Sequence, residues 1–311
     1  MRARLLRVGV ATWLAVALLP AGEPAGQTAA PQFRGGVRLV RVPVTVTGRD
    51  GALVRGLTAA DFDVLEDGVR QTITAFAEGA PGKVLPLHLG VLLDSSGSMA
   101  LDMRETGTAA IRFVDALDEA IDVTLVDFDT RIRLSRFSRP SYPTLFERIR
   151  LRKADGATSL YDALGVYLET AVARGGQHVL LLVTDGGDSA SRMNYSDLEK
   201  MLRFANVIVY ALGYLDHQSS STRAAQQSRL TIIARETGGD AFFPASTRHL
   251  AAIYARILDE LGSRYTIGYA STNATRDGRF RKVQVKLSAG AAATHRSAKV
   301  RTRSGYLAPI R

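Results

Sequence analysis

Five oxygen-bearing side chains have the types and the spacing that could bind a metal ion. Asp94, Ser96 and Ser98 alternate directly after an apolar run, and Thr158 and Asp185 stand in two later polar segments. Carboxylate and hydroxyl oxygens are the ligands that a hard cation such as Mg²⁺ prefers. Because three of the five groups are uncharged hydroxyls, a bound ion would keep enough charge to attract an external anion. These residues therefore predict a Mg²⁺ site, with Mn²⁺ or Ca²⁺ as alternative ions.

The strands that must position these side chains are predicted in the middle of the chain. Residues 87–93 and 178–184 are predominantly apolar runs, which are typical of parallel strands covered on both faces. Ligands of an open parallel sheet bind beyond the carboxyl ends of its strands, where the strand order reverses. Asp94 and Asp185 directly follow these runs, so we expect both at that edge of a doubly wound, Rossmann-like, mostly parallel α/β sheet. Thr158 is expected in a third loop, at the start of a helix.

Helical spacing of apolar residues predicts the helices that cover this sheet. Ser159, with Asp162 three residues later, predicts a capping box at the start of one of them. Further strands are expected over residues 122–128, 131–137, 207–212 and 242–243, and helices over residues 103–117, 160–171, 196–204, 223–237 and 250–261.

Strand patterns at both ends of the chain predict a second, smaller domain. Val40, Val42, Val44 and Val46 alternate with other residues, among them Pro43, and a proline favours an edge position or a bulge. A few strands cannot bury a face alone, so the two ends are expected to meet in one small β-domain. The dipeptide Asp67-Gly68 predicts a hairpin between residues 62–66 and 69–76, and further strands are expected over residues 265–269, 282–287 and 299–303.

The first residues have the layout of a secretory signal peptide. Arg2, Arg4 and Arg7 precede an uncharged run over residues 8–22, and small residues with a proline follow. The run is short for a membrane span, and an uncleaved anchor is the alternative. No later apolar run is long enough to span a bilayer. We therefore expect an exported protein, periplasmic or secreted, with a signal peptide at 1–26, an N-terminal β segment at 33–82, the α/β domain at 86–262 and a C-terminal β segment at 263–308.

Composition narrows the class of protein further. The chain of 311 residues is 46% hydrophobic and 23% charged, as expected for a folded globular protein. It has no cysteine, which excludes a disulfide scaffold, thiol catalysis and cysteine-based zinc sites. Residues 276–311 hold ten basic residues against one acidic residue, Asp277, and so carry most of the net charge of +10. We interpret this basic segment as a solvated strand face and expect no nucleic-acid partner.

The five candidate ligands together resemble a known motif. Asp94-x-Ser96-x-Ser98, then Thr158, then Asp185 within the sequence Val-Thr-Asp-Gly, are similar to the metal-ion-dependent adhesion site of von Willebrand factor type A domains. All five positions match, and the one local departure is an alanine before Thr158 where relatives commonly have a second glycine. The resemblance covers roughly residues 87–261. The flanking segments 56–62, 66–68 and 303–306 resemble those of a bacterial exported subfamily of such proteins.

The resemblance implies a doubly wound fold and a role in binding rather than catalysis. In that family, the two serines and the threonine contact Mg²⁺, the aspartates act directly or through water, and a carboxylate of a partner protein often completes the shell. The chain is therefore expected to be a non-enzymatic, adhesion-type protein-binding module whose partner presents an Asp or Glu. Neither the identity of the partner nor the oligomeric state follows from the sequence.

Two alternatives remain at this point. One is a structural or scaffold protein that keeps a vestigial metal site. The other is a Mg²⁺-dependent phosphatase of the haloacid dehalogenase type, because Asp127 and Asp129 follow an apolar run as that family's nucleophile loop does. Against the phosphatase, the motif falls on the second strand, and no lysine lies between Lys153 and Lys200 to stabilise a phosphoryl group.

Overall fold

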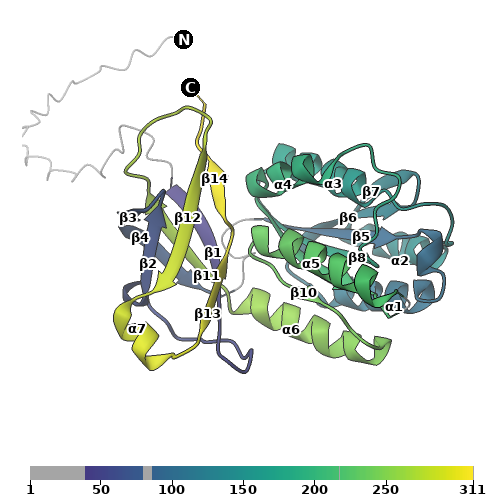
Figure 1. The fold of residues 1–311 in the computed structure, drawn as a ribbon, viewed down its shortest axis with the longest axis horizontal. Coiled ribbons are helices and arrows are strands. Elements are labelled where there is room, and N and C mark those ends of the chain that lie inside the picture. Colours follow the sequence, from purple (N-terminus) through teal and green to yellow (C-terminus); the bar gives the residue numbers. More distant parts are fainter. Residues whose placement is uncertain (1–38, 80–85, 217, 311) are drawn as a thin grey trace, which may run out of the picture. The chain divides into compact units, whose positions relative to one another are not determined.

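The computed structural model describes residues 39–79, 86–216 and 218–310 (Figure 1). The predicted signal peptide at 1–26 lies outside these residues. Within them, no helix combines the length and the apolar character that crossing a membrane would require.

A six-stranded sheet forms the centre of the α/β part, with the strand order β10-β9-β8-β5-β6-β7. All neighbouring strands are parallel except β6 and β7, which are antiparallel. The chain first builds β6 and β7 on one side of β5 and then β8, β9 and β10 on the other, so the strand order reverses at β5. The predicted doubly wound, mostly parallel sheet is confirmed. Its strands are β5 (Leu87–Asp94), β6 (Ala120–Phe128), β7 (Ile132–Ser138), β8 (Gln177–Thr184), β9 (Val207–Gly213) and β10 (Ala241–Phe242).

Helices cover both faces of this sheet, and each face has its own apolar core. Leu89, Val91 and Leu93 of β5 contribute to one core and Leu92 contributes to the other, which explains why the strand is apolar throughout. One core includes α1 (Met103–Ala116), α2 (Tyr142–Arg150) and α6 (Leu250–Gly262), and the other includes α3 (Leu160–Arg174), α4 (Tyr195–Phe204) and α5 (Ser220–Glu236).

Gly90 interrupts the apolar run of β5 for a steric reason. A Cβ at this position would lie 2.3 Å from the ring of Tyr167 in α3. The aromatic side chain therefore fills the space above the strand, and glycine lets the helix approach the sheet closely.

The loop after β8 caps the start of α3, and the predicted capping box is wrong. The side chain of Ser159 makes no capping hydrogen bond. Instead, Ser191 Oγ accepts hydrogen bonds from the N–H groups of Tyr161 and Asp162, both at 3.1 Å. The carboxylate of Asp162 accepts two hydrogen bonds from the backbone of residues 192 and 193. The loop after β8 is thus anchored on the first turn of α3.

Two antiparallel four-stranded sheets combine strands from both ends of the described chain, and the predicted small β-domain is confirmed. Their strand orders are β13-β1-β11-β4 and β14-β12-β2-β3. Val42 and Val44 share a core with Ile267 from the same sheet and with Val64 and Val283 from the other. The first sheet contains β1 (Leu39–Thr47), β4 (Ile73–Glu78), β11 (Tyr265–Ala270) and β13 (Lys299–Thr302), and the second contains β2 (Phe62–Glu66), β3 (Val69–Gln71), β12 (Phe280–Leu287) and β14 (Gly305–Leu307).

The hairpin at Asp67-Gly68 joins β2 to β3. Asp67 has a φ of 48° and Gly68 a φ of 86°, and Glu66 pairs with Val69 across the turn. Positive φ angles at both central residues match the twist of a two-residue hairpin. The expected single strand at 69–76 is, however, divided at Thr72, so that β3 joins one sheet and β4 joins the other.

Pro43 lies in an internal strand, and the predicted edge position is wrong. β1 lies between β13 and β11. The ladder with β13 begins only at Val44, whereas Pro43 pairs with Thr266 of β11. The missing N–H of the proline therefore falls just beyond the end of the neighbouring strand, where no ladder bond is lost.

The α/β part is inserted between two paired strands of the β-domain. β4 ends at Glu78 and β11 begins at Tyr265, and these two residues pair with each other. The N–H of Gly79 also donates a hydrogen bond to the carbonyl of Arg264 at 3.1 Å. The chain therefore leaves the β-domain and returns to it at the same place.

Candidate functional site

Asp94 is the last residue of β5 and lies at the edge where the strand order reverses. Its side chain is buried, with only 1% of the residue exposed. Oδ1 accepts a hydrogen bond from the N–H of Ser96 at 2.9 Å, and Oδ2 accepts one from Thr184 Oγ1 at 2.6 Å. The buried guanidinium of Arg152 reaches the backbone carbonyl of Asp94, at 3.5 Å, and not its carboxylate. Neutral donors therefore fix both carboxylate oxygens.

Ser96 and Ser98 extend the same loop from the interior to the surface. Ser96 is buried, whereas Ser98 is exposed in a short 3-10 turn, η3 (Gly97–Met99). Their two hydroxyl oxygens lie 3.0 Å apart. Three oxygen-bearing side chains thus form a continuous line from a buried carboxylate to solvent.

The loop that carries Thr158 is bonded to the loop after β5. The N–H of Gly97 donates to the carbonyl of Gly156 at 3.1 Å, and the N–H of Asp155 donates to the carbonyl of Ser95 at 2.8 Å. Thr158 is itself buried. The structure therefore places the third hydroxyl in a loop that directly contacts the first one.

A third loop, after β8, closes the arrangement. The N–H groups of Ser189 and Ala190 both donate to the carbonyl of Thr158, at 2.9 Å and 3.0 Å. Ser189 Oγ accepts a hydrogen bond from the N–H of Thr158 at 3.1 Å. Backbone hydrogen bonds thus join the three loops that carry the five candidate ligands.

Asp185 is buried directly after the end of β8. Its Oδ1 accepts a hydrogen bond from the N–H of Gly187 at 2.9 Å, and its Oδ2 accepts one from Gln218 Nε2 at 3.1 Å. As for Asp94, the hydrogen-bond donors are uncharged. The two carboxylates at the centre of the sheet edge are therefore oriented by neutral groups.

The pKa of Asp94 reflects this environment. Burial raises the pKa of Asp94 to about 6, and the negative charge of Asp185 acts in the same direction. The hydrogen bonds from Ser96 and Thr184 lower it and only partly compensate. A buried carboxylate with raised pKa and neutral donors fits a site that is completed by a cation from outside. The all-oxygen donor set fits Mg²⁺ in particular.

The candidate site combines two carboxylates with three hydroxyl groups. Within the described part of the chain, no group of three or more His, Cys, Asp or Glu side chains is placed to hold a metal ion. Two carboxylates alone do not make such a group.

Sequence reasoning missed two residues that position the carboxylates, Thr184 and Gln218. Thr184 could have been found, because it precedes Asp185 and because β5 and β8 are neighbours in register, with Leu93 opposite Val183. Asp94 and Thr184 come next on the two strands. Gln218 had no comparable signal, since it reaches Asp185 from the loop after β9.

Asp127 and Asp129 are held in the hairpin between β6 and β7, as expected from a strand-to-strand turn. Arg133 Nε donates to Asp127 Oδ2 at 2.9 Å, and Arg133 Nη2 donates to Asp129 Oδ2 at 2.6 Å. The hydroxyl of Ser95 donates to the other oxygen of Asp127. Both oxygens of Asp127 are thus used in structural contacts, which gives no support to its role as a phosphatase nucleophile.

The family of the chain follows from the match of its sequence to a family model. The model of the von Willebrand factor type A domain matches residues 88–256, which is more than half of the chain. The chain belongs to the von Willebrand factor type A domain family. The matched residues cover the six strands, except for the first residue of β5, and the five candidate ligands, and we refer to this part as the A domain.

Several solved structures with a similar fold come from bacterial proteins. A von Willebrand factor type A protein from Catenulispora acidiphila is 13% identical, with a TM-score of 0.45 over 89% of this chain and 75% of that chain. The vWF domain of the type V pili tip protein Mfa5 from Porphyromonas gingivalis is 12% identical, with a TM-score of 0.46 over 56% of this chain and 94% of that chain. The pilus adhesin SpaC from Lactobacillus rhamnosus GG is 12% identical, with a TM-score of 0.47 over 80% of this chain and 48% of that chain. No curated protein matches the chain.

Proposed function

We propose that the chain is an exported, adhesion-type module that binds a partner protein through a Mg²⁺ ion held at the edge of the A-domain sheet. The observation that carries the proposal is the buried carboxylate of Asp94. It lies among hydroxyl groups, with neutral hydrogen-bond donors on both oxygens, where three bonded loops meet. The signal-like layout of residues 1–26 supports export.

Each of the five side chains has a distinct part in this proposal. Ser96, Ser98 and Thr158 would bind the ion through their hydroxyl oxygens. Asp94 and Asp185 would supply the negative charge and hold coordinating water or hydroxyl groups in place. A bound Mg²⁺ would supply an exposed positive charge, and an Asp or Glu of the partner would complete its coordination shell.

The residues of the chain also pre-organise the site. Thr184 and the N–H of Ser96 fix the two oxygens of Asp94, and Gln218 fixes one oxygen of Asp185. Such contacts behind metal ligands orient them and keep them from collapsing onto other partners. Because hydroxyls carry no charge, the ion keeps a strong attraction for an external carboxylate.

The direct test is calorimetric titration of the full chain with Mg²⁺. The Asp94→Ala variant is expected to lose Mg²⁺ binding completely, because it removes the buried charge of the site. The matched control is Asp115→Ala, which removes an exposed carboxylate from α1. The control is expected to bind like the wild type, and far-ultraviolet circular dichroism would show that both variants keep the fold.

The outcome that contradicts the proposal is an unchanged Mg²⁺ isotherm in Asp94→Ala. Partner capture by crosslinking from an extracytoplasmic fraction gives a second readout. Capture that EDTA abolishes supports metal-dependent binding. Capture that EDTA leaves intact and salt weakens would instead indicate a scaffold protein acting through its basic strand face.

A further inference from the structure

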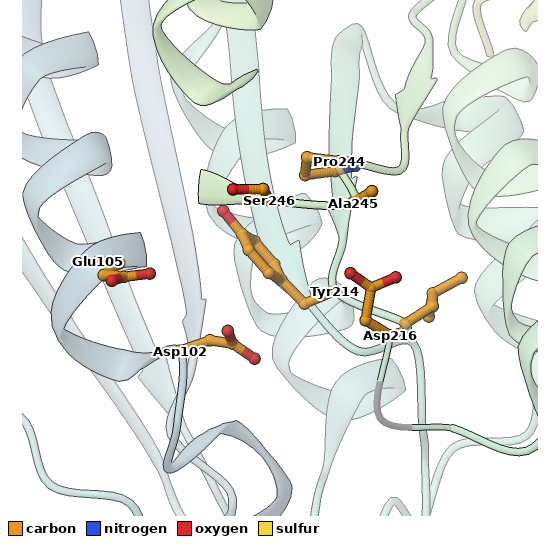
Figure 2. Close-up of a pocket in the computed structure, with 8 residues that line it drawn as sticks. Asp102, Glu105, Tyr214, Asp216, Pro244, Ala245 and Ser246 are labelled. Atoms are coloured by element: carbon orange, nitrogen blue, oxygen red, sulfur yellow. The ribbon is translucent and has the colours of Figure 1, made fainter. Parts of the chain in front are cut away.

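A second candidate site lies at the same edge of the A-domain sheet. A pocket of about 220 Å³ opens between the start of α1, the loop after β9 and the loop after β10. Asp102, Glu105 and Asp216 contribute carboxylates to it, and Tyr214 and Pro244 contribute larger surfaces (Figure 2). Figure 2 shows carboxylates on both sides of the Tyr214 ring. The pocket is therefore an acidic hollow with an aromatic ring at its centre.

The hydroxyl group of Tyr214 has no hydrogen-bond partner among the described residues. Only 8% of Tyr214 is exposed, and its buried hydroxyl oxygen makes no hydrogen bond within the described residues. Burial raises the pKa of Tyr214, and the charges of Asp102 and Glu105 raise it further, so the hydroxyl keeps its proton. Leaving a buried hydroxyl unpaired is unfavourable, and native structures normally pair such groups. This hydroxyl is thus an unsatisfied polar group of a residue that lines the pocket.

Two carboxylates of the pocket, those of Glu105 and Asp216, are also open to a cation. No ion pair in the described part of the chain involves either of them, and both residues are exposed. A ligand that lies between them would therefore carry positive charge.

The structure favours a basic side chain over a metal ion as that ligand. Within the described residues, the three carboxylates do not form a group that is placed to hold a metal ion by itself. The walls of the pocket are partly apolar, from Leu215, Pro244 and the tyrosine ring. Arg and Lys side chains combine an apolar stem with a charged head, and a guanidinium or ammonium group also binds favourably over an aromatic face.

The pocket is connected to the candidate Mg²⁺ site by short contacts. The N–H of Tyr214 donates to the carbonyl of Thr184 at 3.0 Å, and Thr184 Oγ1 donates to Asp94. Gln218, two residues beyond Asp216, donates to Asp185. The pocket and the candidate Mg²⁺ site therefore lie on directly bonded loops of the same sheet edge.

We propose that this pocket binds an Arg or Lys side chain that the partner presents beside its metal-binding carboxylate. The position beside the metal rests on the proposed function, whereas binding of a basic side chain does not. The partner is thereby specified as a surface with an acidic and a basic residue close together. The acidic residue would meet the metal, and the basic residue would lie between Glu105 and Asp216.

The test uses a small probe and needs no metal. The full chain, in EDTA, is titrated with N-acetyl-arginine N-methylamide while amide chemical shifts are followed by NMR. The comparison probe is the citrulline analogue, which has nearly the same shape but no charge. Saturable shifts are expected for the amides of residues 214–216 with the arginine probe, and roughly tenfold weaker binding with citrulline. Equal effects of the two probes would overturn the proposal.

Variants assign the effect to the pocket. The double variant Glu105→Gln, Asp216→Asn is expected to weaken arginine binding by roughly tenfold, whereas Asp115→Asn, farther along α1, leaves it unchanged. Tyr214→Phe keeps the ring and tests the hydroxyl alone. Unchanged binding in the double variant overturns the proposal, as do saturable shifts of the same amides by CaCl₂ at lower concentrations than the arginine probe.

A final variant separates this proposal from the proposed function. Asp94→Ala is expected to lose Mg²⁺ binding but to keep arginine binding in EDTA. Loss of arginine binding in the double variant with normal Mg²⁺ titration supports the pocket alone. Normal Mg²⁺ titration together with no arginine binding by the wild type overturns the pocket and leaves the metal site standing.

Discussion

Two buried carboxylates at different places in the molecule show opposite shifts in pKa. Asp94, at the candidate metal site, and Glu260, in the last turn of α6, each have only 1% of the residue exposed. Burial raises the pKa of Asp94 to about 6. Burial acts on Glu260 in the same direction, but the charges of Arg264 and Arg301 outweigh it and hold the pKa of Glu260 below its usual value.

The difference lies in the neighbours of the two groups. Glu260 accepts hydrogen bonds from Tyr210 at 2.7 Å, from Thr45 at 3.1 Å and from Arg264 at 2.9 Å, and it also pairs with Arg301. Tyr210 belongs to the A domain, Thr45 and Arg301 belong to the β-domain, and Arg264 lies in the connection between α6 and β11. The carboxylate of Asp94 has only neutral donors. A buried charge that is fully paired serves the fold, whereas one that is oriented but unpaired is suited to an external cation.

The largest expected effect concerns Glu260, the buried carboxylate that is paired with arginines. Glu260→Gln would leave Arg264 buried without its counter-charge, and breaking a buried pair in this way costs about 3–5 kcal/mol. We expect a loss of that size in the free energy of unfolding, measured with urea. The control is Asp197→Asn, which removes an exposed pair with Lys200 and should change stability by less than about 1 kcal/mol. A loss below that limit in Glu260→Gln would show that the cluster is not structural.

Asp94, the buried carboxylate without a charged hydrogen-bond partner, predicts a change of the opposite sign in the free energy of unfolding. The folded pKa of Asp94 is raised from 3.8 to about 6, so ionisation above that range favours the unfolded chain. In EDTA at pH 7.5, Asp94→Asn should therefore raise the free energy of unfolding by roughly 1–3 kcal/mol. The amide can keep the bond from the N–H of Ser96 and donate to Thr184. With excess Mg²⁺ the order should reverse, because only the wild type gains stability from binding. If Asp94→Asn were less stable than the wild type in both buffers, the burial of the Asp94 charge would not be destabilising, and the contrast with Glu260 would be wrong.

A buried histidine, His178, gives a smaller effect and again tests how burial shifts a pKa. His178, at the opposite end of β8 from Thr184, has 4% of the residue exposed and stacks on His88 at a ring distance of 4.8 Å. Burial is the main cause that lowers the pKa of His178 from 6.5 to about 4, and the charges of His88 and Arg174 add to it. The unfolded chain therefore takes up a proton first as the pH falls, so stability present above pH 6.5 is lost between pH 6.5 and 4.

The measurement is the free energy of unfolding at pH 7.5 and pH 5 for the wild type and for His178→Phe. The variant should lose roughly 1–2 kcal/mol less than the wild type on acidification. Other titrating groups, Asp94 among them, contribute equally to both proteins and cancel in the difference. His249→Phe, at an exposed histidine, serves as control and should behave like the wild type. Equal acid losses in all three proteins would show that His178 is not shielded from water.

The strands could be predicted from the sequence because their signals are local. β5 and β8 are recognisable as runs buried on both faces, and the turn at Asp67-Gly68 fixes one hairpin. The short helix α2 was missed, because Pro143 and several charged residues surround its few buried side chains. The division of a predicted strand at Thr72 depends on which sheet each half joins, and the residue types there do not specify that.

In the candidate site, too, some features could be predicted from the sequence and others require the folded chain. Its five ligand positions form a pattern in the sequence, although metal binding stays a prediction. The contact between Thr184 and Asp94 requires the register of two strands, and the acidic pocket requires three loops that are distant in the sequence. Tyr214 follows a buried strand and looks like one more core residue. Only its position in the wall of the acidic pocket, seen in the folded chain, distinguishes it.

The pairing of Glu78 with Tyr265 has a consequence for chain entropy. Contacts of the β-domain join residues about 200 positions apart, as between Tyr269 and Glu66, which are 203 apart. Closing so long a flexible loop is unfavourable and slow. A folded A domain replaces that loop with a rigid body whose two ends already lie side by side, as the bond between Gly79 and Arg264 shows. The folded A domain thus brings together the N-terminal and C-terminal strands that form the two sheets of the β-domain.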